Sequence, residues 1–262
     1  MTHKEKQKFH YDKQYYHSGS NVLFSKPDNL WQWGKFYPVL TLEPFFSTIS
    51  KKEILINCCG MVRELPLLNK YEIRVTATDL MIDQLMDYKK AGILSDISLQ
   101  DAENLTYKDN SFDYTYINAG LHHLEYPHKG LAELFRVARE AAIFIEAQDS
   151  FLHGLSRVFG RKKADFEPAG NYVYRWKTRE IEKFALSAHA HSYAVKTIFL
   201  PLRIYMRQIT GYQMTFFKRI FAVLNVFLRK FGNVMIVFIF KSPPSTEQLN
   251  LLKNQNFKYK KL

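Results

Sequence analysis

Residues 101–146 read DAENLTYKDNSFDYTYINAGLHHLEYPHKGLAELFRVAREAAIFIE, and this stretch decides the fold. Its apolar pattern predicts a buried strand over 112–118, a helix over 127–139 and a second buried strand over 141–146. Pro127 suits the first position of that helix, where a missing N–H costs little. Two strands joined by a helix of this length are expected to lie parallel in one sheet, because an antiparallel pair needs only a short turn.

The chain before this stretch repeats the same alternation of strands and helices. Short apolar runs predict strands over 53–58, 73–78 and 97–99, and helices are expected within 36–49, after Gly60 as far as Asn69, and over 81–91. Strands that alternate with helices of this size form parallel crossovers. The sequence therefore predicts an α/β fold with a doubly wound, Rossmann-like sheet.

Beyond residue 150 the sequence predicts two final strands and a helical insert. A helix is expected over 177–190 and strands over 193–200 and 233–241, with an apolar, basic and largely helical insert over 201–232 between those strands. We divide the chain into an N-terminal arm or lid of helices over 1–50, a main domain over 51–241 that contains the insert, and a basic C-terminal tail over 242–262.

Composition and charge limit the function classes. The chain has 262 residues, of which 47% are hydrophobic, so it can bury a full core. Its two cysteines, Cys58 and Cys59, are neighbours, which excludes a disulfide framework and favours a reducing compartment. The N-terminal MTHKEKQKF has no apolar core of a signal peptide, so we expect a cytoplasmic protein.

The positive charge is concentrated in the C-terminal part. Residues 1–150 have a net charge of −3 and residues 151–262 a net charge of +15, which together give the formal +12 of the chain. A field of this sign attracts nucleic acid, acidic lipid head groups, phosphorylated substrates or an acidic partner. The alternative is a solvated basic surface that serves solubility.

Polar or small residues follow four predicted strands in succession, at Gly60, Asp79, Asp101 and Asn118. Parallel sheets bind ligands at the carboxyl ends of their strands, so these residues are expected around one crevice. A carboxylate such as Asp79 matches the two hydroxyls of a ribose, and Asp101 with the N–H of Ala102 matches the edge of an adenine. The alternatives are that Asp79 caps a helix and that Asp101 stabilises a turn.

The quoted stretch resembles the class I S-adenosylmethionine-dependent methyltransferases with a type 11-like domain, through D-A-E-x-L, S-F-D and H-H-L followed by a helix and a strand. The resemblance covers about residues 53–147. It implies a seven-stranded sheet whose last strand, NVMIVFIFK, is antiparallel, and S-adenosyl-L-methionine as cofactor. It also implies cofactor contacts along the strand ends, with Asp79 at the ribose, Asp101 and Ala102 at the adenine and Asn118 and Ala119 at the methionine side. The residues implied at the cofactor are Asn57, Cys58, Cys59, Gly60, Asp79, Leu80, Asp101, Ala102, Asn118 and Ala119.

The segment ILINCCGMVRE over 54–64 departs from this family's pattern of an acidic residue and three glycines. Gly60 matches the middle glycine, whereas Cys58 and Val62 replace the other two and Ile56 replaces the acid. Glycine suits such a loop because the backbone must turn tightly and approach the cofactor. The alternative to an active enzyme is therefore a methyltransferase fold that has lost catalysis and serves as an interaction protein.

The histidines that follow the predicted strand over 112–118 are the candidate catalytic residues. A hydroxyl acceptor needs a base, and an imidazole such as that of His122 or His123 suits proton removal near neutral pH. Either histidine could instead pack or cap. The other paired histidines, His189 and His191, have no cysteine or carboxylate at ligand spacing, so we predict no metal.

The insert and the tail bear on substrate and partners. Residues 214–231 combine a wide apolar face with a basic edge, which suits a membrane interface or packing over the sheet. The ending KNQNFKYKKL makes nucleic acid a second candidate partner. Base-amine methyltransferases carry an NPPY-like tetrad where this chain reads NAGL. We therefore expect O-methylation of a small-molecule, glycan or lipid-linked acceptor, with RNA methylation as the alternative. Besides the cytoplasm, peripheral contact with the inner membrane face is the second expected location.

Overall fold

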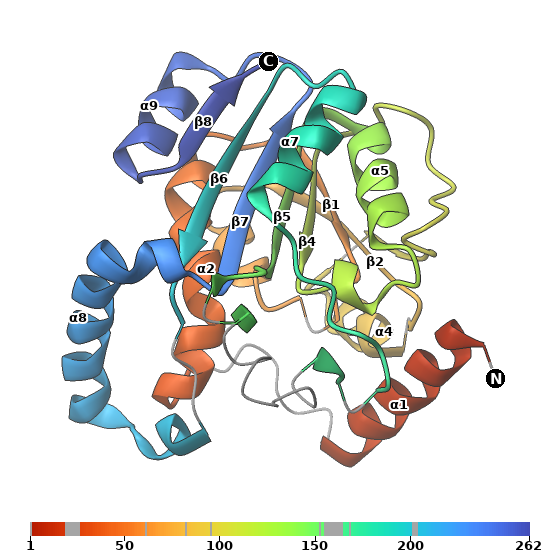
Figure 1. The fold of residues 1–262 in the computed structure, drawn as a ribbon. Helices are drawn as coiled ribbons and strands as arrows, with labels where there is room; N and C mark the ends of the chain where they lie inside the picture. The colour runs from red at the N-terminus through yellow and green to blue at the C-terminus, as the bar shows by residue number, and fades with distance from the viewer. Residues whose placement is uncertain are drawn as a thin grey trace.

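An eight-stranded sheet forms the centre of the computed structural model (Figure 1). The structure describes residues 2–18, 27–60, 62–81, 83–94, 96–151, 153–154, 165–167, 169–200 and 204–262. The strand order is β3-β2-β1-β4-β5-β7-β6-β8. The strands are β1 Glu53–Asn57, β2 Arg74–Asp79, β3 Asp96–Leu99, β4 Phe112–Asn118, β5 Ala138–Ala147, β6 Ser192–Ile198, β7 Val234–Phe240 and β8 Lys258–Lys261.

Strands β1 to β5 are mutually parallel, and β7 lies antiparallel between β5 and β6. This confirms the predicted doubly wound α/β fold with an antiparallel strand after the helical insert. The sheet has eight strands and not seven, because part of the expected basic tail folds. Ser245 caps helix α9, Thr246–Asn254, in a capping box with Gln248, and β8 then pairs antiparallel with β6.

Helices cover both faces of the sheet (Figure 1). The α-helices are α1 His3–Ser18, α2 Leu30–Ser47, α3 Leu65–Asn69, α4 Asp83–Lys90, α5 Pro127–Val137, α7 Thr178–Ser187, α8 Gly211–Leu228 and α9, and the 3₁₀ turns are η1 Leu121–His123, η3 Ile204–Gln208 and η4 Arg229–Phe231. Alternate residues of β7 point to opposite layers, so that Phe238 packs with α2 and α9 while Val237 packs with α5 and α7.

Helix α8, the core of the expected insert, lies at the periphery of the fold (Figure 1). Phe221 is its one buried residue and packs edge-on against Trp33 and Tyr37 of α2, with ring centroids 5.4 and 5.5 Å apart. The large apolar residues that α8 leaves exposed are Tyr212, Phe216, Phe217, Ile220, Val223, Val226 and Phe227. Among the residues that the structure describes, no helix has the length and apolar character needed to cross a bilayer.

Candidate active site

A cavity of about 350 Å³ lies at the carboxyl ends of the parallel strands. Its wall is formed by the loop after β1, the ends of β2 and β4, and the N-terminal helix α1. The cavity has the size of a small-molecule site. Among the residues that line it are Cys58, Gly60, Asp79, Asn118, Ala119 and His123.

The loop after β1 keeps a glycine-type backbone without the glycines. Cys58, Gly60 and Val62 have φ values of +48°, +48° and +40°, and these are the three positions at which the resemblance expects glycine. Side chains other than glycine are strained at such values, most of all a β-branched valine. Asn57 holds the turn, because its Oδ1 accepts from the N–H of Cys58 at 2.9 Å and from the hydroxyl of Thr78 at 3.0 Å.

The carboxylate of Asp79 is fixed by backbone donors on both oxygens. Oδ2 accepts from the N–H of Gly60 at 3.0 Å and Oδ1 from the N–H of Met81 at 3.1 Å. The contact with Met81 resembles a helix cap, so the two predicted roles of Asp79 are compatible. Burial raises its pKa, although these N–H bonds favour the ionised form. A carboxylate offers about four acceptor positions, which leaves room here for a pair of ribose hydroxyls.

Asp101 and Ala102 do not line the cavity. Lys4 of α1 lies between two carboxylates, with its Nζ 2.5 Å from Asp101 Oδ2 and 2.8 Å from Glu103 Oε2. Burial opposes ionisation of Asp101, but Lys4 lowers its pKa below the ordinary value. Lys4 of α1 therefore pairs with the carboxylate of Asp101, which the sequence analysis expects at the adenine. The contact between Asp101 and adenine stays a prediction.

The residues of the predicted cofactor set thus occupy two kinds of place. Cys58, Cys59, Gly60, Asp79, Leu80, Asn118 and Ala119 line the cavity. Asn57, Asp101 and Ala102 lie behind its wall, where Asn57 is fully buried and shapes the loop. Burial and the nearby Asp79 raise the pKa of both cysteine thiols well above the ordinary value, so these side chains offer neutral contacts.

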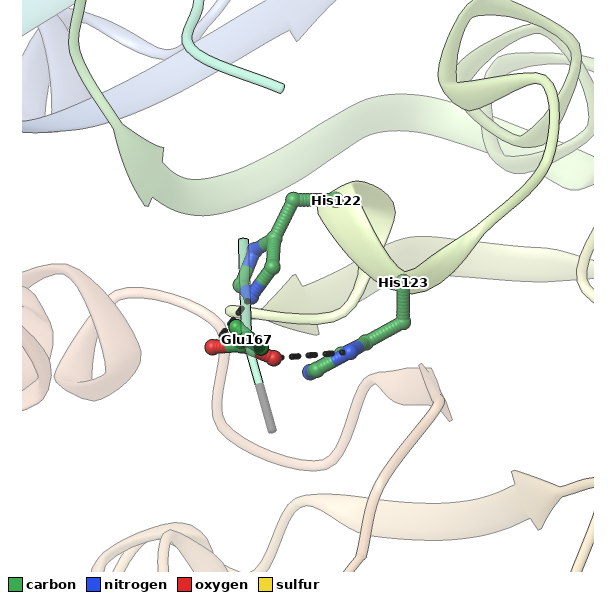
Figure 2. Close-up of side chains that lie close together, drawn as sticks. All are labelled: His122, His123 and Glu167. Carbon is green, nitrogen blue, oxygen red and sulfur yellow. Dashed lines mark ion pairs between the residues drawn. The ribbon is translucent and has the colours of Figure 1, made fainter. Parts of the chain in front are cut away.

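The two candidate catalytic histidines lie beside Glu167 (Figure 2), and His122 also contacts Glu146. His122 is buried, with Nδ1 2.7 Å from Glu146 Oε2 at the end of β5 and Nε2 3.5 Å from Glu167 Oε1. His123 lines the cavity, and its Nδ1 lies 3.3 Å from Glu167 Oε2. The two imidazole rings are 4.2 Å apart.

The electrostatics of the two imidazoles differ. Burial alone would lower the pKa of His122, but Glu146 and then Glu167 raise it to about 10. Burial and the adjacent His122 lower the pKa of His123 to about 4, and the histidines lower the pKa of Glu167 to about 2. His122 is therefore held as a cation between two carboxylates, whereas His123 is a neutral imidazole at the cavity wall.

Several residues of this site were missed by the sequence analysis. Asn171 donates from Nδ2 to the backbone oxygen of His122 at 3.1 Å and accepts from Gln7 Nε2 of α1 at 3.1 Å. Glu146 was predicted only as the last residue of the strand over 141–146. No motif or pattern in the sequence indicated a role for Glu167. Within the described ranges, His122, His123 and Glu167 form the group whose ligand atoms could hold a metal ion, since these atoms lie within 4.8 Å of one another.

Comparison with known families and structures agrees with this geometry. Residues 57–145 match the model of a family described as a methyltransferase domain. No curated protein matches the chain. The YcgJ protein from Bacillus subtilis is similar in structure, with a TM-score of 0.57 and 13% identity over 79% of this chain and 100% of that one.

Two further structures share the fold. A putative methyltransferase from Bacillus halodurans C-125 has a TM-score of 0.52 and 14% identity over 78% of this chain and 99% of its own. Magnesium protoporphyrin IX methyltransferase from Synechocystis PCC 6803, with bound SAH, has a TM-score of 0.53 and 16% identity, and the match covers 80% of this chain and 84% of that chain. At these identities the likeness establishes the fold and not the acceptor.

Proposed function

Since the chain carries a methyltransferase domain with the class I S-adenosylmethionine-dependent fold, we propose that it methylates a hydroxyl of a small-molecule, glycan or lipid-linked acceptor. The observation that carries this proposal is that Asp79 and His123 both line one cavity at the strand ends. A carboxylate for the cofactor and an imidazole for the acceptor thus face the same space.

The residues of the cavity fit the cofactor. Bound there, S-adenosyl-L-methionine supplies a methyl group on a sulfonium sulfur. Asp79 would accept from the ribose hydroxyls, and the left-handed backbone at Cys58, Gly60 and Val62 lets the loop approach the cofactor as a glycine loop would. Asn118 and Ala119, at the end of β4, would lie on the methionine side.

The protein's main contribution to the reaction is to hold the acceptor oxygen in line with the methyl group. An acceptor hydroxyl that took up the methyl group would lose its proton, so the chain's own residues would have to hold the oxygen and receive that proton. Orientation supplies most of the acceleration in such a transfer. Of the two candidate histidines we assign the assistance to proton loss to His123, because it is a neutral imidazole that lines the cavity, whereas His122 already carries its proton.

The exposed face of α8 supports an acceptor at a membrane surface. Val226 and Phe227 are 66% and 72% exposed, and Lys218, Arg219, Arg229 and Lys230 are the charged residues of 211–231. An apolar face with basic flanks binds anionic bilayers. We therefore propose a cytoplasmic enzyme that reaches a glycan or lipid-linked acceptor by peripheral contact with the membrane.

Calorimetric titration with S-adenosyl-L-methionine tests the cofactor site. Asp79→Asn is expected to weaken binding by about tenfold or more, because a neutral amide is a poorer acceptor for two hydroxyls. Asp87→Asn, an equal charge change on an exposed residue of α4, serves as control and should leave affinity unchanged. No binding to the parent protein would favour a catalytically silent interaction protein, and salt-sensitive RNA binding beside cofactor binding would favour RNA as acceptor.

A further inference from the structure

We propose that His122, His123 and Glu167 form a binding site for a divalent transition-metal ion beside the cofactor cavity (Figure 2). The sequence predicts no metal, because His189 and His191 have no cysteine or carboxylate at ligand spacing along the chain. In the folded protein Glu167 supplies a carboxylate to both His122 and His123. The site itself does not depend on the proposed acceptor.

The separations of the ligand atoms suit a small cation. Nitrogen and carboxylate ligands lie about 2.0–2.2 Å from zinc, so two ligand atoms of a tetrahedral site are about 3.3–3.6 Å apart. The carboxylate of Glu167 has one oxygen 3.5 Å from His122 Nε2 and the other 3.3 Å from His123 Nδ1. These two distances run to different oxygens of Glu167, and one ligand atom from each of the three residues lies within 4.8 Å of the others, so a small shift of the side chains would bring all three onto one cation.

A buried carboxylate orients one of these ligands. Glu146 is 1% exposed and accepts from the N–H of Leu121 through one oxygen and from His122 Nδ1 through the other, at 2.6 and 2.7 Å. A metal ion at Nε2 would take the place of the proton that the free His122 cation holds toward Glu167, while Glu146 keeps the other proton on Nδ1. A histidine ligand whose other ring nitrogen donates to a carboxylate is the usual arrangement around a metal in proteins.

The three ligands determine which cations the site prefers and how many coordination positions stay open. Two imidazoles and one carboxylate favour zinc or iron(II) over magnesium or calcium, which prefer oxygen ligands. Three protein ligands leave at least one coordination position open. Because His123 lines the cavity, we expect that position to face the acceptor. A hydroxyl bound there would lose its proton more easily, and this catalytic use alone rests on the proposed function.

Metal binding is measured on the untagged, EDTA-treated chain without any methyl-transfer assay. Titration with Zn²⁺ against a chromophoric chelator should give one tight site per chain. Glu167→Gln and His123→Gln should each weaken it by more than about tenfold, since even residues behind the ligands change metal affinity by that much. Glu125→Gln, an equal charge change on the same cavity wall, is the control and should bind Zn²⁺ as the parent does.

A second measurement identifies the ligands and separates loss of binding from loss of fold. Co²⁺ should give visible d–d absorption without thiolate bands, and the Cys58→Ser/Cys59→Ser variant should retain the site. Far-UV circular dichroism confirms that each variant is folded. Absence of a stoichiometric site, equal affinity in Glu167→Gln, or loss of binding in the cysteine variant would each overturn the proposal. Cofactor titration of the same samples reports separately on the methyltransferase site.

Discussion

The strained loop after β1 predicts that the usual difference between two substitutions is lost at position 62. Val62 is fully buried and has a φ of +40°. In most buried positions alanine is tolerated better than glycine, because glycine costs more conformational entropy and leaves out the β-carbon. At position 62 we expect Val62→Gly to be about as stable as Val62→Ala, because alanine keeps the strain of a left-handed backbone and glycine does not.

The magnitudes follow from three effects. Val62→Ala removes two methyl groups of a buried valine, which costs about 1.6 kcal/mol at about 0.8 kcal/mol for each buried carbon, and Val62→Gly removes the β-carbon as well, at about 0.8 kcal/mol more. The entropic cost of glycine adds roughly 0.5–1 kcal/mol. Relief of the left-handed strain returns roughly 1–2 kcal/mol to the glycine variant and nothing to the alanine variant, so we expect the two variants to have free energies of unfolding within about 1 kcal/mol of each other.

Urea denaturation followed by circular dichroism measures this difference. Val75 of β2 is the matched control, because it is a buried valine in a strand and does not have a positive φ. There the usual order should hold, with Val75→Ala more stable than Val75→Gly. If alanine is more stable than glycine by as much at position 62 as at position 75, the left-handed conformation is not present in the protein in solution and the loop is not of the glycine type.

Two further predictions concern α1 and α8. Lys4→Met leaves the buried carboxylate of Glu103 with one donor fewer, so urea denaturation should show a loss of about 1–2 kcal/mol, whereas Lys51→Met, which breaks an exposed pair, should show no measurable change. Phe227→Asp should weaken flotation with phosphatidylserine vesicles by about tenfold or more, since one large apolar side chain contributes about 1.5–3 kcal/mol to such an interface. Phe227→Leu should retain most of the binding, and equal binding of the Asp variant would remove α8 from the interface.

The fold of the central region could be predicted because its strands are continuous apolar runs. Phe112–Asn118 has the predicted bounds. Strand β5 begins at Ala138, three residues earlier than predicted, because Arg139 and Glu140 interrupt the apolar run but form ion pairs with Asp113 and Lys52 at the edge of the core. A prediction based on hydrophobicity therefore places the start of such a strand too late.

The outer elements could not be predicted, since long-range contacts or edge pairing place them. Helix α1 shows no apolar period, and its position depends on Lys4 and Gln7, whose partners lie about a hundred residues or more away in the chain. Strand β8 reads KYKK and was assigned to a basic tail. Lysine is nevertheless common on edge strands, where it discourages pairing with other molecules.

The residues of the candidate site that directly follow strands, such as Asp79 and Asn118, could be predicted from the sequence. The cluster of His122, His123, Glu146 and Glu167 could not. Burial of His122 requires a hydrogen-bonding partner for each ring nitrogen, so the sequence alone could demand a carboxylate but could not say which one. Glu146 comes from the neighbouring strand and Glu167 from a segment 45 residues after His122. A buried histidine that only filled space would need polar partners, but neither partner would have to be a carboxylate. The second carboxylate, shared with His123 at the cavity wall, is the feature that argues for a site built to hold a positive charge.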